Sequence, residues 1–268
     1  MQANRHYILD AYGCFSEQAD NIMIINDLLI QLADELGMGA VMPPFIIPYY
    51  YCDDPQDVGI SAFCICANGA HITIHTFPER SCYFVDILTD NYFEEADVTH
   101  MIGKQIYASN MNSKVIDRRI FDGEQPGIDK AYDFGPHYMI SVRDLDVTFE
   151  DIFKWLDTIA EKINMVPISR PYVIYDKVEK PDYISGMLVV AQSHIAFHYC
   201  ISQRAANLDI FSCSFLDAEV IDTIMRQCFN GKVEMNLLAR GSKYKIECQH
   251  RSRQAKIDKC KKWRNHIQ

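Results

Sequence analysis

Four residues that could take part in covalent or acid–base chemistry lie close together in the sequence. They are Ser193, His194, His198 and Cys213, set among β-branched and aromatic residues between positions 185 and 213. Apolar runs of this kind, bounded by polar residues, are typical of paired buried strands. Hydroxyl, imidazole and thiol groups serve as nucleophiles, bases and proton donors in catalysis. An isolated serine or histidine on such a strand is usually only a hydrogen-bonded part of the core, so a wider pattern is needed to indicate chemistry.

That wider pattern is an internal repeat. Three features of the later stretch recur earlier in the chain with the same spacing and no gap. The matched pairs are His71 with His194, His75 with His198, and residues 85–90 with 208–213. In this alignment Ala70 takes the place of Ser193, and Asp90 takes the place of Cys213. A repeat of this length predicts that the chain is built from two copies of one structural unit.

The predicted secondary structure repeats in the same order. In the first part we expect a strand at 5–14, a helix at 17–36, strands at 40–52, 59–67, 70–77 and 82–89, and a helix at 93–110. In the second part we expect a strand from 137, a helix at 149–164, strands at 171–176, 184–191, 193–201 and 207–213, and a helix at 217–229. Ser16 and Gly37 are the expected start and stop of the first helix, and Thr148 with Asp151 forms a capping box.

Two similar halves follow from this order. We expect an N-terminal repeat over 1–116, a polar linker over 117–135, a C-terminal repeat over 136–239 and a basic tail over 240–268. Each half would be a mainly antiparallel sheet with helices on one face, which leaves the other face to be covered. Packing those faces together predicts an α+β protein, a pseudo-twofold α/β/β/α sandwich that forms an intramolecular pseudo-dimer. Further pairing into a homodimer is left open.

Composition narrows the class of protein. The 268 residues are 49% hydrophobic, enough for a sizeable core, and the net charge of −10 argues against a general nucleic-acid binder. No apolar stretch approaches the roughly 20 residues that span a bilayer, so we expect no membrane partner. The first residues lack the pattern of a signal peptide, and the ten cysteines have no secretory context. We therefore expect a cytoplasmic protein with reduced thiols.

The tail has a different character from the rest of the chain. Residues 240–268 hold ten lysines and arginines, against Glu247 and Asp258. A solvated terminal helix is the usual explanation of such a run, and a surface for an anionic partner is the alternative.

The motifs of both halves resemble those of S-adenosylmethionine decarboxylase, the pyruvoyl-dependent enzyme of spermidine synthesis. The bacterial form of that family has a Ser-Gly pair, then a Glu-Ser-His-Ile segment, then a Val-Asp-x-Phe-Thr-Cys motif. The matching segments here are 185–186, 192–198 and 208–213 in the second half, and 5–6 and 71–79 in the first. The resemblance covers nearly the whole chain outside the linker and the tail.

In that family one serine becomes the cofactor, and Ser193 occupies its position. The serine hydroxyl attacks the preceding carbonyl, and elimination then cuts the chain and leaves a pyruvoyl group. The resemblance therefore implies a cleavage site between Gln192 and Ser193 and a self-generated pyruvoyl cofactor. Its ketone would form a Schiff base with the substrate amine and act as electron sink for decarboxylation. Gln192 replaces the family's glutamate, whose loss could slow cleavage.

The resemblance also implies one site shared between the halves. The C-terminal half keeps Ser193 and the family's proton-donating cysteine, Cys213. The N-terminal half keeps the assisting histidine, His75, and the glutamate that holds the ribose hydroxyls, Glu79. Ser61 is the candidate assisting serine, although its distance from the cut position is one residue longer than that of its counterpart in the second half.

A second, degenerate site would be formed by the remaining residues, Ala70, Asp90, Ser185 and His198. Ala70 has no hydroxyl for the attack, and Asp90 stands where the family has its cysteine. One complete site per chain is therefore expected.

Two further groups could contact the substrate. Asp10 falls where the family has an acidic residue, and it could contact the substrate's charge. The aromatic residues Phe45, Tyr49 and Tyr50 could stack on adenine or attract the sulfonium cation. Aromatic residues in such strands are more often plain core.

Several alternatives remain. The same pyruvoyl chemistry could act on ornithine or arginine, although Glu79 favours a substrate with a ribose. A non-catalytic paralogue that regulates an active decarboxylase is also open, since one half has lost its serine and cysteine. The histidine pairs at 71 and 75 and at 194 and 198 share a strand face and could bind a metal. We expect no metal, because no third ligand has motif spacing.

Overall fold

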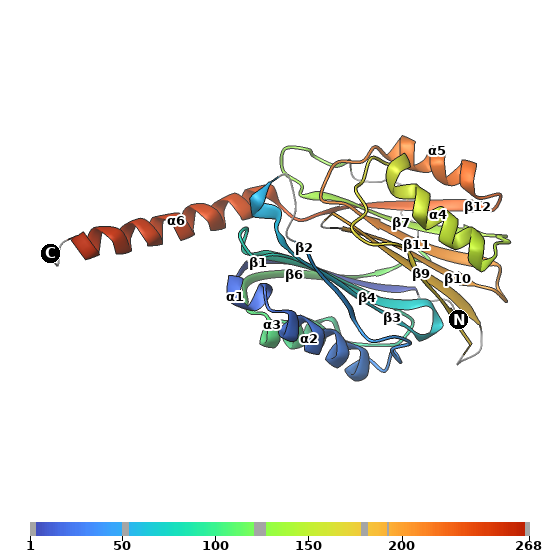
Figure 1. Ribbon diagram of the computed structural model, residues 1–268, viewed down its shortest axis with the longest axis horizontal. Helices are drawn as coiled ribbons and strands as arrows, with labels where there is room; N and C mark the ends of the chain where they lie inside the picture. The colour runs from blue at the N-terminus through green and yellow to red at the C-terminus, as the bar shows by residue number, and fades with distance from the viewer. Residues whose placement is uncertain (1–3, 50–53, 121–126, 178–181, 192, 266–268) are drawn as a thin grey trace.

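The computed structural model describes residues 4–49, 54–120, 127–177, 182–191 and 193–265. Two antiparallel sheets lie face to face, with helices on the outer face of each, and one long helix leaves the body (Figure 1). The predicted α+β sandwich of two similar halves is therefore confirmed.

The first sheet is built by the N-terminal half and has six strands in the order β2-β3-β4-β5-β1-β6. Its strands are β1 (Arg5–Cys14), β2 (Phe45–Tyr49), β3 (Gly59–Cys66), β4 (Ala70–Phe77), β5 (Cys82–Thr89) and β6 (Ala108–Asp117). The helices on its outer face are α1 (Ser16–Ala19), α2 (Ile22–Glu35) and α3 (Glu95–Gln105). Short 3-10 turns at η1 (Pro55–Asp57) and η2 (Ala67–Gly69) precede β3 and β4.

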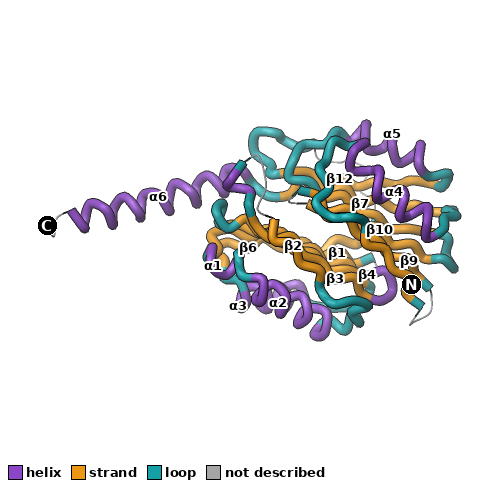
Figure 2. Tube along the Cα trace, in the orientation of Figure 1, coloured by secondary structure: helices purple, strands orange, loops and turns teal. Residues whose placement is uncertain are grey.

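The second sheet repeats this plan in the order β12-β7-β11-β10-β9-β8. Its strands are β7 (Gly135–Arg143), β8 (Tyr172–Asp176), β9 (Tyr183–Val190), β10 (Ser193–Cys200), β11 (Ala205–Phe211) and β12 (Lys232–Arg240). Its helices are α4 (Phe149–Lys162) and α5 (Ala218–Cys228). The layers are seen edge-on in Figure 2.

The alternation of side chains along each strand explains the layers. On β1, Tyr7 and Leu9 point to the helices and join an apolar core, whereas His6 points to the other sheet. On β10, Ile195 and Phe197 likewise pack under α4 and α5. Each half therefore has its own helix-side core, and the polar residues of the motifs gather between the sheets.

Some predicted boundaries were wrong. The expected helix at 93–110 ends at Gln105, and the chain then forms the edge strand β6. The first expected helix is split into α1 and α2, and Asn21 caps α2 by accepting hydrogen bonds from two backbone N–H groups. Ser16 is not its N-cap, because its hydroxyl donates to the carbonyl of Pro78. The capping box of Thr148 and Asp151 at the start of α4 is confirmed.

The tail forms the helix α6 (Lys243–Asn265), which runs away from the two sheets (Figure 1). The expectation of a terminal helix is confirmed for these residues. Arg240, which the sequence placed in the basic tail, instead ends β12 and is fully buried. Within the described residues, none of the helices combines the length and the apolar character needed to cross a membrane.

Candidate active site between the two sheets

A chain of three polar side chains links the two sheets beside the predicted cleavage site. The Ser61 hydroxyl lies 2.9 Å from Nδ1 of His75, and Nε2 of His75 lies 2.8 Å from Nδ1 of His194. The two imidazole rings are stacked, with 5.1 Å between their centroids. Ser61 and His75 come from adjacent strands of one sheet, and His194 comes from the other. Because His194 directly follows Ser193, the chain ends next to the predicted cleavage serine.

A second chain of the same kind links the sheets at the pseudo-symmetric position. The Ser185 hydroxyl lies 2.9 Å from Nδ1 of His198, and Nε2 of His198 lies 2.8 Å from Nδ1 of His71. These rings are stacked as well, with centroids 4.9 Å apart. The duplication in the sequence is thus reproduced as two cross-sheet Ser–His–His chains.

Strand register explains why Ser61 meets His75 despite its unequal spacing. In the β3–β4 hairpin Ser61 pairs with His75, and in the β9–β10 hairpin Ser185 pairs with His198. The loop of the first hairpin contains one residue more, and Asn68 within it has a positive φ of 61°. The extra residue is absorbed in this turn, so both serines reach the same register.

Ser193 and Cys213 lie together at the ends of neighbouring strands. The Ser193 hydroxyl oxygen accepts a hydrogen bond of 3.0 Å from the backbone N–H of Cys213, and Ser193 is fully buried. The Cys213 thiol donates weakly to the carbonyl of Ala191 at 3.6 Å. Burial raises the pKa of Cys213, and the charge of Asp57 from the other half raises it further, so the thiol stays protonated at neutral pH. Gln192 lies outside the described residues.

The other predicted site residues are less closely gathered. Glu79 is exposed and forms an ion pair with Arg253 of α6 at 3.8 Å. Asp10 forms an ion pair with Arg240, whose Nε lies 2.7 Å from the Asp10 carboxylate. Phe45 packs beside Phe63, with centroids 5.3 Å apart. Tyr49 ends β2, and Tyr50 is outside the described residues.

At the degenerate site a tyrosine fills the space between the halves. Tyr183 is fully buried, and its ring lies so close to Gly69 that a Cβ there would stand 2.6 Å from it. The register places Gly59, which has no side chain, at the equivalent position of the first half. Ala70 is buried and Asp90 is exposed. The expected second site therefore has Ala70 where the other half has Ser193, and an aromatic ring lies beside its turn.

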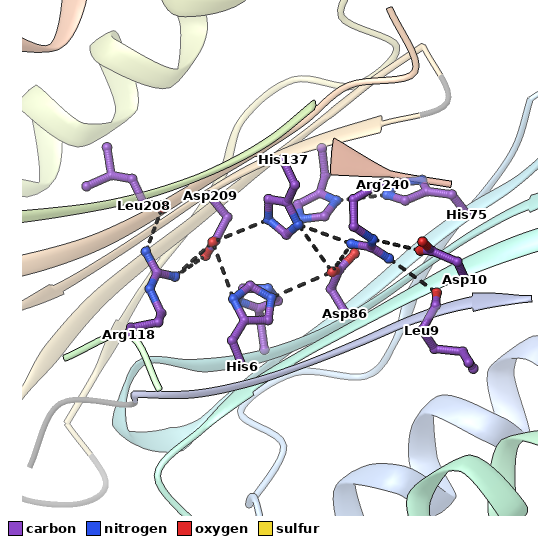
Figure 3. A network of polar contacts seen from close by, with 12 residues as sticks. His6, Leu9, Asp10, His75, Asp86, Arg118, His137, Leu208, Asp209 and Arg240 are labelled. Atoms are coloured by element: carbon purple, nitrogen blue, oxygen red, sulfur yellow. Dashed lines mark hydrogen bonds and ion pairs between the residues drawn. The ribbon is translucent and has the colours of Figure 1, made fainter. Parts of the chain in front are cut away.

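Between the two Ser–His–His hydrogen-bond chains lies a buried ionic cluster that the sequence did not predict (Figure 3). Its members are His6, Asp86, Arg118, His137, Asp209 and Arg240, each at most 3% exposed. Each arginine reaches a carboxylate of the opposite half. Arg118 donates to both oxygens of Asp209 at 2.8 Å, and Arg240 donates to Asp86 at 2.6 Å.

The signal for this cluster was present in the repeat. His6 and His137 lie near the starts of equivalent strands, and Asp86 aligns with Asp209 in the repeat. The sequence does not distinguish a buried polar residue in a repeat from a solvated one. Arg118 sat in the presumed linker. Only the packing of the sheets shows where these side chains meet.

The arginines determine the charge state of the cluster. Burial opposes ionisation of Asp86, but the attraction of Arg240 outweighs it and holds the pKa of Asp86 well below its usual value. Arg118 does the same for Asp209. His6, Asp86 and His137 bring three potential metal ligand atoms within 4.8 Å of one another. A metal there would lie beside the guanidinium of Arg240, which already supplies the positive charge, so the cluster fits a metal ion poorly.

Fold and site together define an internally duplicated α+β sandwich with two cross-sheet Ser–His–His chains, one of which ends next to Ser193 and Cys213. The family model for S-adenosylmethionine decarboxylase matches residues 5–119 and 144–241, one match in each half. The chain therefore belongs to the S-adenosylmethionine decarboxylase family.

Individual relatives match one half. The S-adenosylmethionine decarboxylase proenzyme of Thermoanaerobacter sp. strain X514 is 31% identical over 119 residues, which are 44% of this chain and 90% of the relative. The proenzyme of Clostridium kluyveri is 30% identical over 122 residues, covering 45% and 90%. Among solved structures, the adenosylmethionine decarboxylase of Aquifex aeolicus VF5 is 22% identical with a TM-score of 0.36, covering 47% of this chain and all of that one. The relatives thus correspond in length to about half of this chain.

Proposed function

We propose that the protein is a self-processing, pyruvoyl-dependent decarboxylase of S-adenosylmethionine with one active site between its halves. The observation that carries the proposal is the pairing of Ser193 and Cys213 at strand ends beside the Ser61–His75–His194 chain. Relatives named S-adenosylmethionine decarboxylase proenzyme support the reaction and its self-cleaved form. The product would be the aminopropyl donor for spermidine synthesis.

Self-processing would begin at the Ser193 hydroxyl. Its oxygen forms a bond to the carbonyl carbon of Gln192, the amide C–N bond breaks, and the hydroxyl proton passes to the released amine. His75 stays neutral because burial holds its pKa well below its usual range, and it would assist the step by orienting the Ser61 hydroxyl that it contacts. Loss of the Cα proton of residue 193 then expels the Gln192 carboxylate. Water replaces the nitrogen of the resulting dehydroalanine, and ammonia leaves.

The residues present fit a pyruvoyl group at position 193. Once formed, that group supplies a ketone that binds the substrate amine and accepts the electron pair released with carbon dioxide. The backbone N–H of Cys213 already points at the serine oxygen from 3.0 Å. The protonated thiol of Cys213 would return a proton to the substrate carbon, since its raised pKa keeps it neutral. Glu79, at the end of the neighbouring hairpin, would hold the ribose if its pairing with Arg253 opens.

The location that fits this proposal is the cytoplasm. The nine described cysteines are free thiols, five of them buried, as expected in a reducing compartment.

Chain length tests the proposal. Intact mass spectrometry of the purified protein should show fragments of residues 1–192 and 193–268, the second blocked at its N-terminus. Ser193→Ala should leave one uncut chain. Ser61→Ala should slow the cut about 10²-fold, as expected when a catalytic side chain is lost, whereas the matched Ser185→Ala should not. An uncut wild-type chain would favour the regulatory paralogue instead.

The substrate is tested separately. Cleaved protein should release carbon dioxide from S-adenosylmethionine and not from ornithine or arginine. Glu79→Gln should raise KM for S-adenosylmethionine with a smaller change in kcat, because a ribose contact is made in the ground state as well as the transition state. Turnover of ornithine or arginine in preference would show that the substrate assignment is wrong while the pyruvoyl chemistry stands.

A further inference from the structure

We propose that His194 is a positioning residue for the self-cleavage at Ser193: the imidazole from one sheet holds the imidazole that the other sheet contributes to the reaction. This inference rests on the proposed function, because it concerns how His75 and Ser61 act on the cleavage site.

The contact is specific in its geometry. His75 has two ring nitrogens, and each has one partner, Ser61 at 2.9 Å and His194 at 2.8 Å. The ring planes of the two histidines differ by 10°, and both side chains are at most 1% exposed. Neither ring can turn without breaking a buried hydrogen bond, which would cost more than an exposed one. His194 thereby holds His75 at the only ring nitrogen that Ser61 leaves free.

The Nε2 atom of His194 indicates the order of donors and acceptors along the Ser61–His75–His194 hydrogen-bond chain. Nε2 of His194 is buried and has no hydrogen-bond partner among the described residues. Buried N–H groups without an acceptor are rarer than buried acceptors without a donor, so the proton of His194 belongs on Nδ1. It then donates to Nε2 of His75, whose own proton lies on Nδ1 and donates to the Ser61 oxygen. The hydroxyl hydrogen of Ser61 is left free to donate to another acceptor.

Because both imidazole rings are neutral, a neighbouring group must determine which ring nitrogen of His75 carries the proton. Burial lowers the pKa of His194 to about 4 and that of His75 well below its usual value. Other groups act on the pair electrostatically as well: Asp86, His137, Asp209 and His6 on His194, and Asp86, Arg240 and His137 on His75. A neutral imidazole carries one proton, and the partner at the second nitrogen decides which nitrogen holds it. An orienting group in this position controls rate through the tautomer, as the aspartate of a Ser–His–Asp triad does.

The pseudo-symmetric chain offers a matched control within the same molecule. His71 contacts His198 with the same atoms of its own ring as His194 uses, at the same 2.8 Å, and its Nε2 is likewise without a partner among the described residues. The chain it belongs to runs from Ser185 through His198 to His71, and the residue before His71 is Ala70, which has no hydroxyl to start the reaction. His71 and His194 should therefore contribute similarly to folding and differently to cleavage.

Cleavage rates of full-length chains made by cell-free translation test the inference. His194→Ala should slow cleavage about 10²-fold, the usual effect of losing acid–base positioning. His194→Asn should recover most of that loss, because the amide N–H of asparagine can take the place of Nδ1–H. His71→Ala should match His194→Ala in its drop in Tm and still cleave at the wild-type rate. Wild-type cleavage by His194→Ala would overturn the inference, and so would equal slowing by both alanine variants, which marks a merely structural role.

A second measurement separates this inference from the proposed function. In the uncleavable Ser193→Ala chain, ¹⁵N chemical shifts of the imidazoles should show His75 protonated at Nδ1. Adding His194→Ala should abolish that single tautomer, and adding His71→Ala should not. Unchanged His75 shifts would overturn the positioning role even if the wild-type chain is cut. A wild-type chain that stays uncut overturns the proposed function, and the role in cleavage falls with it.

Discussion

At the scale of single residues, Arg240 and Arg118 form ion pairs across the interface between the two halves. Arg240 leaves the end of β12 and donates to Asp10 and Asp86 of the other half at 2.7 and 2.6 Å. Arg118 leaves the end of β6 and grips Asp209, together with the carbonyls of Ile140 and Leu208. Each half thus neutralises a buried carboxylate of its partner half. The halves are held together by charges that neither could bury alone.

Removing one of these cations should be costly. Arg240→Met leaves the Asp86 carboxylate fully buried without its counter-charge, and we expect a loss of roughly 3–5 kcal/mol in the free energy of unfolding. Urea denaturation at pH 7 measures it. The double variant Arg240→Met/Asp86→Asn should recover part of the loss, because the uncompensated charge is gone. Equal stability of Arg240→Met and the wild type would contradict this view of the cluster.

At the scale of elements, α6 has an apolar anchor in its first turn, polar contacts with the body as far as Arg253, and a solvated end. Ile246 is buried against Tyr12, Phe84 and Phe134 in a cluster that closes one end of the interface. Farther along, Ile257 is 40% exposed and Trp263 is 70% exposed. The apolar contact that holds the helix to the body is therefore confined to its start.

This division predicts unequal effects of matched substitutions. Ile246→Ala should lower the free energy of unfolding by about 2–5 kcal/mol, because it leaves a cavity in a packed cluster. Ile257→Ala, the same change on an exposed turn of the same helix, should alter it by no more than about 0.5 kcal/mol. Thermal unfolding followed by circular dichroism compares the two. Similar Tm values would show that the first turn does not anchor the helix.

The edge strands show how far the sequence predicts the elements. The central strands were found because their apolar residues are continuous and repeated, as in β4 and β10. The edge strand β6 was mistaken in part for helix, because its residues alternate between exposed and half-buried and include no apolar run. β12 was also missed, because it pairs with β7, which lies far earlier in the sequence. An edge strand is identified by its partner strand, which lies far away in the sequence.

At the scale of the whole molecule, stability should depend on pH through the histidines between the sheets. Burial lowers the pKa of both His194 and His198 to about 4, from an ordinary value of 6.5. Between these values the unfolded chain binds protons that the folded protein does not. Stability is therefore complete above pH 6.5 and falls as the pH drops towards 4, by up to roughly 3 kcal/mol for each histidine.

Urea denaturation between pH 7.5 and 4.5 at constant ionic strength tests this dependence. His198→Gln should be less stable at pH 7.5 but show a shallower decline. Asp86 and Asp209, whose pKa values are held low, contribute stability above the unfolded carboxyl pKa, near 4, and lose it only below. As the pH falls, the stability contributed by the two aspartates therefore begins to be lost near pH 4, where the loss due to the histidines ends. A flat profile from pH 7 to 4.5 would mean that the histidines are not buried neutral in the folded protein.

The sequence by itself determined the repeat, the strand pairs of each hairpin and the residue types that could do chemistry, because alternation and spacing act over a few residues. Its resemblance to the family assigned Ser193 and Cys213 to one site and named His75 and Ser61 as assisting residues from the other half. Tertiary structure alone decided that His75 meets His194, that Arg118 leaves its presumed linker for Asp209, and that Tyr183 fills the space beside Gly69. These contacts join residues about 90 to 120 positions apart, and they exist only when the two sheets face each other and exclude water.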